Sequence, residues 1–198
     1  MAMTSRSIPM HPHEITESSA PTVRGSFTPD LVSSKTWVID QLSGLAPRLG
    51  TVYVLGSWFG NLGVLMHLDP RVQCDRLINV DHDQRAIQQG RRLANLIPHN
   101  RVYHVCADAN RLGYHHLDPN GAVINTSLGN MPNQGWFQRI PPGTLVVLQA
   151  RDHDPGQEYQ DTDHMLREFP LDVHYRGHRR FHDPETAYTR FMLIGRRH

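Results

Sequence analysis

The sequence predicts an α/β fold in which a seven-stranded, mostly parallel sheet carries helices on both faces and ends in an antiparallel strand. Three observations carry this prediction. Short apolar runs alternate with segments of helical periodicity along most of the chain. A glycine-rich turn follows the first apolar run. The last two apolar runs are joined by a connector without helical periodicity, which is typical of a hairpin rather than of a parallel crossover.

The first half of the chain predicts a leading helix followed by strand–helix units. Thr28 and Pro29 are typical of a helix start, because threonine caps the first turn and proline fits the first helical position. A later helix is expected to stop near Pro98. In chain order, the predicted elements are a helix from 28 to about 45, a strand at 52–55, a helix from about 61 to 68, a strand at 76–80, a helix over 86–97 and a strand at 101–106.

The second half predicts the remaining strands and one more helix. A turn at Pro141-Pro142-Gly143 precedes the fifth apolar run. The spacing of the apolar residues between 159 and 169 is helical. The predicted strands lie at 122–125, 145–149, 173–175 and 189–194.

The composition predicts one domain in a cytoplasmic protein. Residues 1–26 are rich in Ser, Thr, Pro and His without periodicity and are expected to form a flexible N-terminal arm, so that the domain spans 27–198. No apolar run reaches membrane-spanning length and residues 1–26 hold no continuous apolar signal segment, so neither a membrane partner nor secretion is expected. Cys74 and Cys106 form no motif and are expected to be buried thiols in a reducing compartment.

The charges are nearly balanced. Lys and Arg number 20 and Asp and Glu 19, which gives a formal net charge of +1 and does not predict a nucleic-acid partner. The 14 histidines lack the spacing of metal-binding motifs, so no metal is predicted. The alternative is a metal-binding role for His153, which stands between Asp152 and Asp154. Nothing in the sequence indicates the oligomeric state.

Gly56, Gly60 and Gly63 follow the first predicted strand. A strand that turns sharply into a helix with a ligand against its backbone needs residues without a Cβ atom. Tight packing between strand and helix explains the same glycines without a ligand. Their GxxxGxxG spacing differs from the GxGxxG fingerprint of dinucleotide-binding proteins, which disfavours NAD and FAD.

Acidic side chains end the next two predicted strands. Asp81 lies 18 positions after Gly63, where a carboxylate can accept hydrogen bonds from both ribose hydroxyls of an adenosine-type ligand. Asp83 can cap the following helix, which leaves Asp81 available for the ligand. His82 either flanks the adenine or stays in solvent. Asp108, after the third strand, either reads the exocyclic amine of adenine or caps a helix.

The fourth predicted strand ends in Asn125, Thr126 and Ser127. Their amide and hydroxyl groups are expected to point into the same crevice, because the carboxyl ends of parallel strands meet at one edge of a sheet. Reacting groups would be held here. The alternative is that these polar side chains form hydrogen bonds only within the loop that follows the strand.

Together these residues resemble the motifs of class I S-adenosylmethionine-dependent methyltransferases, over about residues 50–150 in motifs and 28–198 in element order. The resemblance implies a Rossmann-like three-layer sandwich, S-adenosyl-L-methionine as the cofactor and methyl transfer as the reaction. Gly56, Ser57 and Gly60 match the loop that approaches the methionine part of the cofactor. Asp81 matches the ribose-binding acid.

The resemblance continues through the next two strand ends. Asp108 and Ala109 match the adenine-binding segment, and Asn125 matches the first residue of the motif after the fourth strand. The cofactor-binding residues that we expect are Gly56, Ser57, Trp58, Gly60, Asp81, His82, Asp108, Ala109 and Asn125.

Three departures from the family pattern predict an atypical member. Val54 and Leu55 stand where the family carries an acid near the end of the first strand. The segment from Asn125 lacks the Pro-Pro-aromatic sequence of many DNA and protein amino-methyltransferases, which disfavours an amide or an adenine amine as the acceptor. Trp58 and Phe59 are unusual in the cofactor loop, where they either wall the substrate cavity or pack the loop against the helix.

Methyl transfer to a protonated amine or a hydroxyl needs a base. We expect Asn125, Ser127 and His104 to be the catalytic residues, and His153 and Tyr188 are alternative bases. Because the sequence contains no obvious inserted substrate domain, a small molecule or a short peptide is the expected substrate.

Three other functions stay open at the level of the sequence. The same cofactor can donate or cyclise its aminocarboxypropyl group. A nicotinamide-dependent oxidoreductase is a second alternative, although the glycine spacing and the late strand pair count against it. The third is a non-catalytic module that binds an adenosine ligand.

Overall fold

The computed structural model describes residues 22–98, 101–131, 133–153, 156–183 and 186–198. The strands are β1 (Arg48–Leu55), β2 (Gln73–Asp81), β3 (Val102–Cys106), β4 (Ala122–Asn125), β5 (Leu145–Arg151), β6 (Leu171–His182) and β7 (Ala187–Arg197). The helices are α1 (Pro29–Leu45), α2 (Asn61–Leu68), α3 (Gln84–Ala94), α4 (Gly135–Gln138) and α5 (Thr162–Glu168), with short 3-10 helices η1 (Arg24–Phe27), η2 (Ala109–Arg111) and η3 (Leu128–Asn130).

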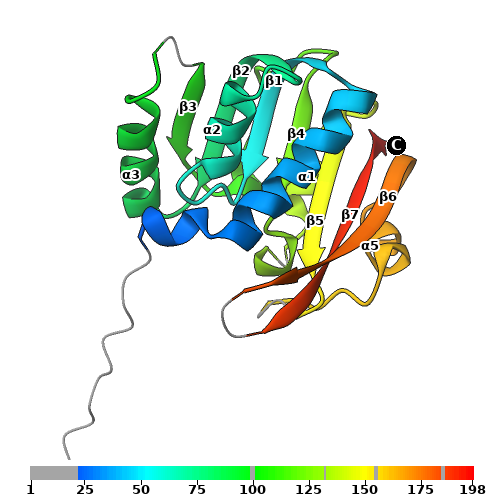
Figure 1. Ribbon diagram of the computed structural model, residues 1–198. Helices are drawn as coiled ribbons and strands as arrows, with labels where there is room; N and C mark the ends of the chain where they lie inside the picture. Colours follow the sequence, from blue (N-terminus) through cyan, green and yellow to red (C-terminus); the bar gives the residue numbers. More distant parts are fainter. Residues whose placement is uncertain (1–21, 99–100, 132, 154–155, 184–185) are drawn as a thin grey trace, which may run out of the picture.

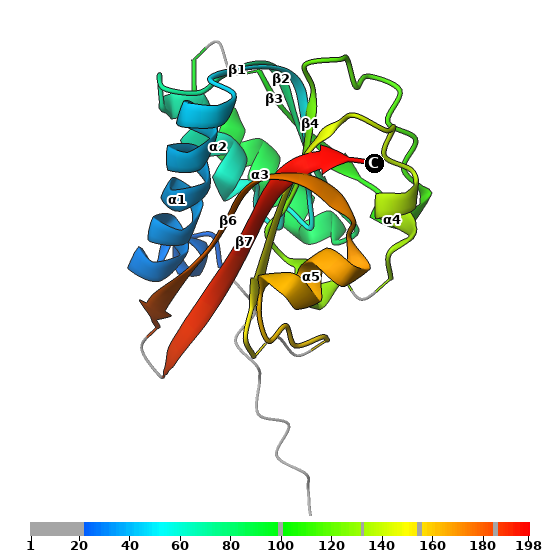
Figure 2. The ribbon, with the colours of Figure 1, turned by 90° about the vertical axis from the view of Figure 1, so that its right-hand side faces the viewer.

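All seven strands form one sheet in the order β3-β2-β1-β4-β5-β7-β6. Helices α1, α2 and α3 cover one face of the sheet, while α4 and α5 lie on the other (Figures 1 and 2). β1 to β5 run parallel, and β7 runs antiparallel to β5 and to β6. The predicted three-layer α/β sandwich with an antiparallel last strand is confirmed.

The carboxyl ends of β1 to β4 lie at the same level of the sheet. Leu55 at the end of β1 pairs with Val80 on one side and with Asn125 on the other. Asp81 at the end of β2 pairs with Cys106 at the end of β3. The segments that follow these four strands therefore leave the sheet side by side.

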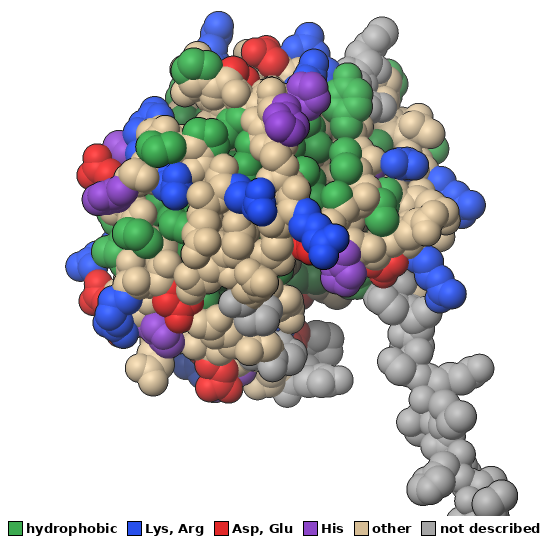
Figure 3. All heavy atoms as spheres, turned by 180° about the vertical axis from the view of Figure 1, so that it is seen from behind, with side chains coloured by type: hydrophobic (Ala, Val, Ile, Leu, Met, Phe, Trp, Pro, Cys, Tyr) green, Lys and Arg blue, Asp and Glu red, His purple; other side chains and the backbone are tan. Residues whose placement is uncertain are grey.

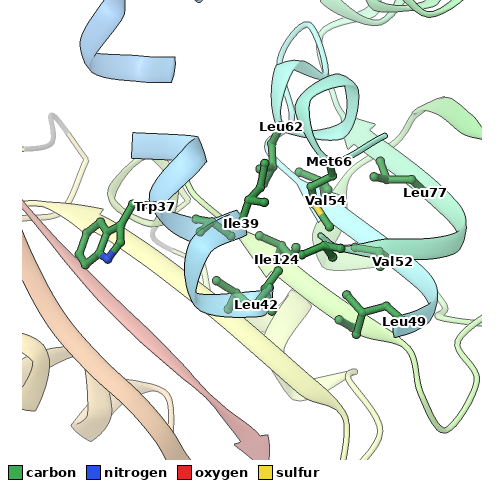
Figure 4. Close-up of a cluster of buried hydrophobic side chains, with 14 of the residues drawn as sticks. Trp37, Ile39, Leu42, Leu49, Val52, Val54, Leu62, Met66, Leu77 and Ile124 are labelled. Atoms are coloured by element: carbon green, nitrogen blue, oxygen red, sulfur yellow. The ribbon is translucent and has the colours of Figure 1, made fainter. Parts of the chain in front are cut away.

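The centre of the sheet is apolar on both faces. Every residue of β1 after its exposed first residue is buried, and so is every residue of β4. This continuous burial is expected of parallel strands that carry helices on both sides. Figure 4 shows the core on the α1 face, where side chains of α1, β1, α2, β2 and β4 meet. The labelled members are Trp37, Ile39, Leu42, Leu49, Val52, Val54, Leu62, Met66, Leu77 and Ile124.

The last two strands form a hairpin that is much longer than predicted. The predicted segment 173–175 lies near the start of β6, and the predicted segment 189–194 is the central part of β7. β6 is an edge strand in which only Leu171 and Phe181 are buried, so its exposed residues show little apolar alternation. Its hydrogen bonds to β7, rather than an apolar pattern, hold it in the sheet.

Local corrections concern the helix ends and the cysteines. α5 spans 162–168 rather than the predicted 159–169, because Asp161 caps it by accepting the N–H of His164 at 2.6 Å. Thr28 precedes α1 as predicted but makes no side-chain capping bond. Cys106 is exposed and Cys74 half-buried, so the prediction of two buried thiols is wrong.

Part of the predicted N-terminal arm, residues 1–21, lies outside the described residues. Residues 24–26 belong to η1, and Ser26 is buried against α2, where its hydroxyl accepts a hydrogen bond from Asn61 at 2.7 Å. Within the described ranges, none of the helices combines the length and the hydrophobicity needed to cross a lipid bilayer.

Candidate functional site

A cavity of about 780 Å³ lies at the carboxyl ends of β1 to β4 and is lined by residues of the four segments that follow these strands. Its volume falls within the range of about 300–1,000 Å³ that is usual for small-molecule sites. Six of the nine predicted cofactor-binding residues line it, and they are Gly56, Trp58, Asp81, His82, Asp108 and Ala109. Ser57, Gly60 and Asn125 are not among the lining residues.

Gly56 brings the segments after β1 and β4 into contact. It adopts a φ of 56°, in the left-handed region that favours glycine. A Cβ atom here would lie 3.0 Å from the Met131 sulfur and 3.1 Å from the Ser127 Cβ. The Ser127 hydroxyl donates to the Gly56 carbonyl at 3.1 Å. The close approach of the two segments thus requires the glycine.

Trp58 holds an unusual backbone conformation at the cavity wall. Its φ is 51°, which is costly for a bulky side chain and persists only where the surroundings enforce it. Its N–H donates to a carboxylate oxygen of Asp81 at 2.7 Å, which ties the loop to the end of β2. The indole lies 4.6 Å from the Phe59 ring between centroids, and Phe59 is buried. Trp58 therefore faces the cavity while Phe59 packs the loop against the protein.

Gly60 serves the packing of α2 rather than the cavity. It precedes α2 with a φ of 76°, and a Cβ atom would lie 2.5 Å from both the Asn79 amide nitrogen and the His104 ring. The backbone of the loop can approach this buried pair only because the side chain is absent.

Asp81 is held by two backbone donors. One carboxylate oxygen accepts the N–H of Trp58, and the other accepts the N–H of Asp83 at 2.9 Å. The side chain is only 10% exposed. Asp83 caps α3 by accepting the N–H of Arg85 at 2.8 Å, as the sequence suggested. Each oxygen of Asp81 retains acceptor capacity, because a carboxylate oxygen can accept more than one hydrogen bond.

In the cavity wall after β3, Asp108 is positioned for both of the roles that the sequence suggested. Asp108 accepts the N–H of Asn110 at 2.9 Å and so caps η2, while it also lines the cavity. Ala109 beside it is buried and lines the same wall. His82 lines the cavity from the β2 side with a side chain that is 90% exposed.

Asn125 and Ser57 lie beneath the cavity rather than at its surface. The Asn125 side chain is fully buried, its carbonyl accepts the N–H of Ser127 at 2.9 Å, and its amide points at the Met131 sulfur at 3.4 Å. The amide thus satisfies its own loop and positions Ser127, which does line the cavity. The Ser57 hydroxyl is buried and has no hydrogen-bond partner among the described residues.

His104 lies away from the cavity, between the sheet and α3. Its ring packs against Gly60 and against Gly90 of α3, where a Cβ atom would lie 2.5 Å away, and its nearest polar contact is the Asn79 amide at 3.5 Å. Burial, with a smaller contribution from Arg91, lowers the pKa of His104 to about 4. The geometry gives His104 a packing position and no access to a bound substrate.

Several lining residues were not singled out in the sequence. Asn110, Asn130, Met131 and Asn133 line the cavity from the segments after β3 and β4. Asn110 also accepts the N–H of Trp136 at 3.1 Å, so it links the two segments. The accumulation of asparagines after the third and fourth apolar runs is the only sequence signal that marks them.

The metal alternative gains no support. His153 is exposed in the turn after β5, and Asp154 lies outside the described residues. No group of three or more His, Cys, Asp or Glu side chains suited to a metal ion occurs in the part of the chain that the structure describes.

The sequence matches no protein-family model and no curated protein. The structure, in contrast, is similar to solved methyltransferases. The N-methyltransferase NodS from Bradyrhizobium japonicum WM9, in complex with S-adenosyl-L-homocysteine, superimposes with a TM-score of 0.61 at 16% identity over 87% of this chain and 91% of NodS.

Two further structures show the same likeness. Magnesium protoporphyrin IX methyltransferase (ChlM) from Synechocystis PCC 6803, with bound S-adenosylmethionine, gives a TM-score of 0.59 at 11% identity over 84% of this chain and 82% of ChlM. TrmK from M. capricolum, in complex with S-adenosyl-homocysteine, gives 0.59 at 7% identity over 80% of this chain and 68% of TrmK. This chain therefore has the fold of the class I S-adenosylmethionine-dependent methyltransferases.

Proposed function

We propose that the protein is an S-adenosylmethionine-dependent methyltransferase that acts on a small molecule or a short peptide. One observation carries the proposal. Gly56, Asp81, Asp108 and Ser127 follow four adjacent strands and meet at a single cavity, in a fold whose solved examples include complexes with this cofactor and its product.

The cavity suits an adenosine ligand from end to end. Asp81 is fixed by two N–H donors and would accept the ribose hydroxyls. Asp108 and Ala109 form a polar and an apolar wall for the adenine. Gly56 exposes backbone where the methionine part would pass, next to the hydroxyl of Ser127.

The position of the missing acid is apolar. Val54 and Leu55 at the end of β1 are 1% and 0% exposed and belong to the core on opposite faces of the sheet. Neither side chain can bind the methionine amine. This part of the cofactor would bind to the backbone of the 56–60 loop.

S-adenosylmethionine supplies an electrophilic methyl group on a sulfonium sulfur, and the neutral thioether leaves with the bonding electrons. The protein then has to align the acceptor with the methyl–sulfur bond and to exclude water. Ser127 would orient the acceptor, because its hydroxyl oxygen keeps free acceptor capacity after donating to Gly56. Trp58 and Met131 would exclude water on either side.

The face of the molecule that lies opposite α1 to α3 supports a small substrate rather than a nucleic acid. Figure 3 shows the face opposite α1 to α3, where basic and acidic side chains are interspersed instead of forming one basic stripe. The described residues all belong to the sheet, its helices and their connections, without a second substrate-binding domain.

A thermal-shift panel tests cofactor binding. The ligands are S-adenosylmethionine, S-adenosylhomocysteine, methylthioadenosine and NAD. At about one hundred times its dissociation constant, a bound ligand stabilises the native state by about 2.7 kcal/mol. A shift with the S-adenosyl compounds is expected. A shift with NAD alone would instead indicate an oxidoreductase, and no shift with any of the four would contradict the proposal.

Mass spectrometry of the products separates the two uses of the cofactor. Incubation with S-adenosylmethionine and a mixture of amine, hydroxyl and thiol acceptors should yield S-adenosylhomocysteine and an acceptor that has gained one methyl group. Release of methylthioadenosine would instead identify transfer or cyclisation of the aminocarboxypropyl group.

A further inference from the structure

Beside the cavity, a second group of charged side chains lies on the face of the sheet that α1 covers. Arg151 of β5 and Arg190 of β7 are paired residues in the antiparallel register. Arg190 has the same orientation along β7 as Met192, which belongs to the core beneath α1. Lys35 approaches from α1, and its pKa responds to Arg190. We call Lys35, Arg151 and Arg190 the basic cluster.

Arg190 is buried, and part of its hydrogen-bonding capacity is unused. It is 5% exposed, and one terminal nitrogen donates to the Thr126 carbonyl at 3.3 Å. Its Nε is buried and has no partner among the described residues. The Tyr188 ring lies 5.7 Å from the guanidinium carbon, which offers a weak cation–π contact. A buried guanidinium so poorly paired is costly, and a bound anion would remove the cost.

Lys35 is a second cation without a partner. It is half-buried and forms neither an ion pair nor a hydrogen bond with any residue in the described ranges. Burial and then the charge of Arg190 lower its pKa to about 8, against the opposing effect of Asp30. Two like charges are thus held near each other on the α1 face of the sheet.

The carboxylates around the cluster are already engaged. Asp30 accepts the Tyr188 hydroxyl at 2.6 Å, and Asp183 accepts Arg151 at 3.2 Å. Asp152 accepts the N–H of Thr189 at 2.9 Å and forms no ion pair with the basic cluster in the described structure. Among the residues that the structure describes, no carboxylate forms an ion pair with Lys35 or Arg190, so both cations are open to an anion that binds from outside.

The basic cluster adjoins the reacting end of the cavity. Thr126, whose carbonyl holds Arg190, directly precedes Ser127, which lines the cavity beside Gly56. On the proposed function, on which this inference rests, an acceptor placed beyond Ser127 would bring its other end to Lys35 and Arg190. We propose that Lys35 and Arg190 bind an anionic oxygen group, a carboxylate or a phosphate, of the methyl acceptor. The planar fork of arginine and the point charge of lysine both suit such groups.

Anion titrations of the protein loaded with S-adenosylhomocysteine test the proposal. Acetate and inorganic phosphate are added at constant ionic strength, with chloride as the reference, while the amide resonances of Thr126 and Ser127 are followed. A saturable shift with acetate, phosphate or both is expected in the wild type. Arg190→Gln and Lys35→Gln should each weaken that binding at least tenfold. Arg180→Gln, which alters an exposed arginine of the same hairpin, should leave it unchanged.

Three results would overturn the proposal. The first is a wild-type response no different from that to chloride, and the second is saturable binding that survives Arg190→Gln. The third is competition, in which the anions displace S-adenosylhomocysteine and Arg190→Gln weakens the binding of S-adenosylhomocysteine. Arg190 would then hold the carboxylate of the cofactor rather than that of the acceptor. If S-adenosylhomocysteine itself does not bind, the proposed function fails, whereas titration of the free protein still shows whether an anion binds at Arg190. Should Arg190→Gln not fold, Lys35→Gln gives the same test from α1.

Discussion

At the scale of single residues, Asp81 connects three parts of the crevice. Its carboxylate fixes the backbone of Trp58, begins the turn toward α3 through Asp83, and faces the cavity. The contact with Trp58 helps to hold the left-handed backbone of this bulky residue, a conformation that persists only where the surroundings enforce it. On the proposed function, one side chain would therefore couple the affinity for the cofactor to the shape of the glycine loop.

We predict that Asp81→Asn weakens the binding of S-adenosylhomocysteine by roughly 10- to 100-fold, because hydrogen bonds to a charged group contribute about 1.5–3 kcal/mol. Isothermal calorimetry measures the change. Asp75→Asn is the matched control, since Asp75 is an exposed carboxylate of the same strand outside the cavity lining and its replacement should preserve both affinity and stability. Equal affinity in Asp81→Asn and the wild type would rule out this role of Asp81.

We predict that Gly60→Ala lowers the free energy of unfolding by roughly 2–5 kcal/mol. The backbone there is left-handed, and the new Cβ would lie 2.5 Å from Asn79 and from His104. Gly44→Ala is the control within α1, where a Cβ meets nothing within 4 Å. This control should stabilise the protein by about 0.5–1 kcal/mol. Urea denaturation measures both, and a neutral Gly60→Ala would contradict the packing described for the loop.

The residues of the site differ in how far a sequence can predict them. Glycines after a strand and acidic residues at strand ends have few structural roles, so the sequence is sufficient to predict that Gly56, Asp81 and Asp108 lie at the cavity. The direction of a side chain at a strand end depends on packing that the sequence does not display. His104 faces α3 because Gly60 and Gly90 leave room for its ring, and Asn125 folds into its own loop.

At the scale of elements, α5 holds together the segments that follow β4 and β5, the first of which lines the cavity. Glu168 accepts Gln157 at 2.6 Å, Tyr159 at 3.1 Å and Gln134 at 3.2 Å. Gln134 belongs to the segment after β4, while Gln157 and Tyr159 belong to the segment after β5. One carboxylate thus positions both segments.

We predict that Glu168→Ala destabilises the protein by roughly 1–3 kcal/mol, because three donors lose a charged acceptor. Backbone hydrogen exchange should accelerate in residues 128–134 and 156–160. The control is Asp163→Asn, which breaks an exposed ion pair with Arg176 and should cost less than about 1 kcal/mol. Unchanged exchange in both segments would show that α5 does not hold them.

The elements near the middle of the sheet are predictable because burial imposes a pattern on their residues. α2 and β4 begin and end at the predicted residues, and β4 is buried throughout. The β6–β7 hairpin is not predictable to its full length, because the exposed histidines and arginines of β6 carry no alternation and are placed by pairing with β7. Its length matters, since the same hairpin brings Arg190 to the carbonyl of Thr126, which directly precedes the cavity residue Ser127.

At the scale of the whole molecule, His104 makes the native state sensitive to acid. The folded pKa is about 4, below the ordinary value of 6.5, so the unfolded chain takes up a proton first as the pH falls. The stability associated with neutral His104 is complete above pH 6.5 and is lost as the pH falls from 6.5 to 4.

We predict that the wild type loses about 2 kcal/mol between pH 7 and pH 5 that His104→Gln does not lose, a difference that follows from the lowered pKa. Urea denaturation of both proteins at the two pH values measures it, and His104→Gln, which keeps the other histidines, is the reference for their contribution. A stability difference between the two proteins that is the same at both pH values would refute the assignment.

The crystal structure of the complex with S-adenosylhomocysteine tests the central claim most directly. The account predicts the ribose hydroxyls at hydrogen-bonding distance from the Asp81 carboxylate, the adenine beside Asp108 and Ala109, and the sulfur facing Gly56 and Ser127. A nucleoside bound outside this crevice, or crystals that take up no S-adenosylhomocysteine at saturating concentration, would contradict it.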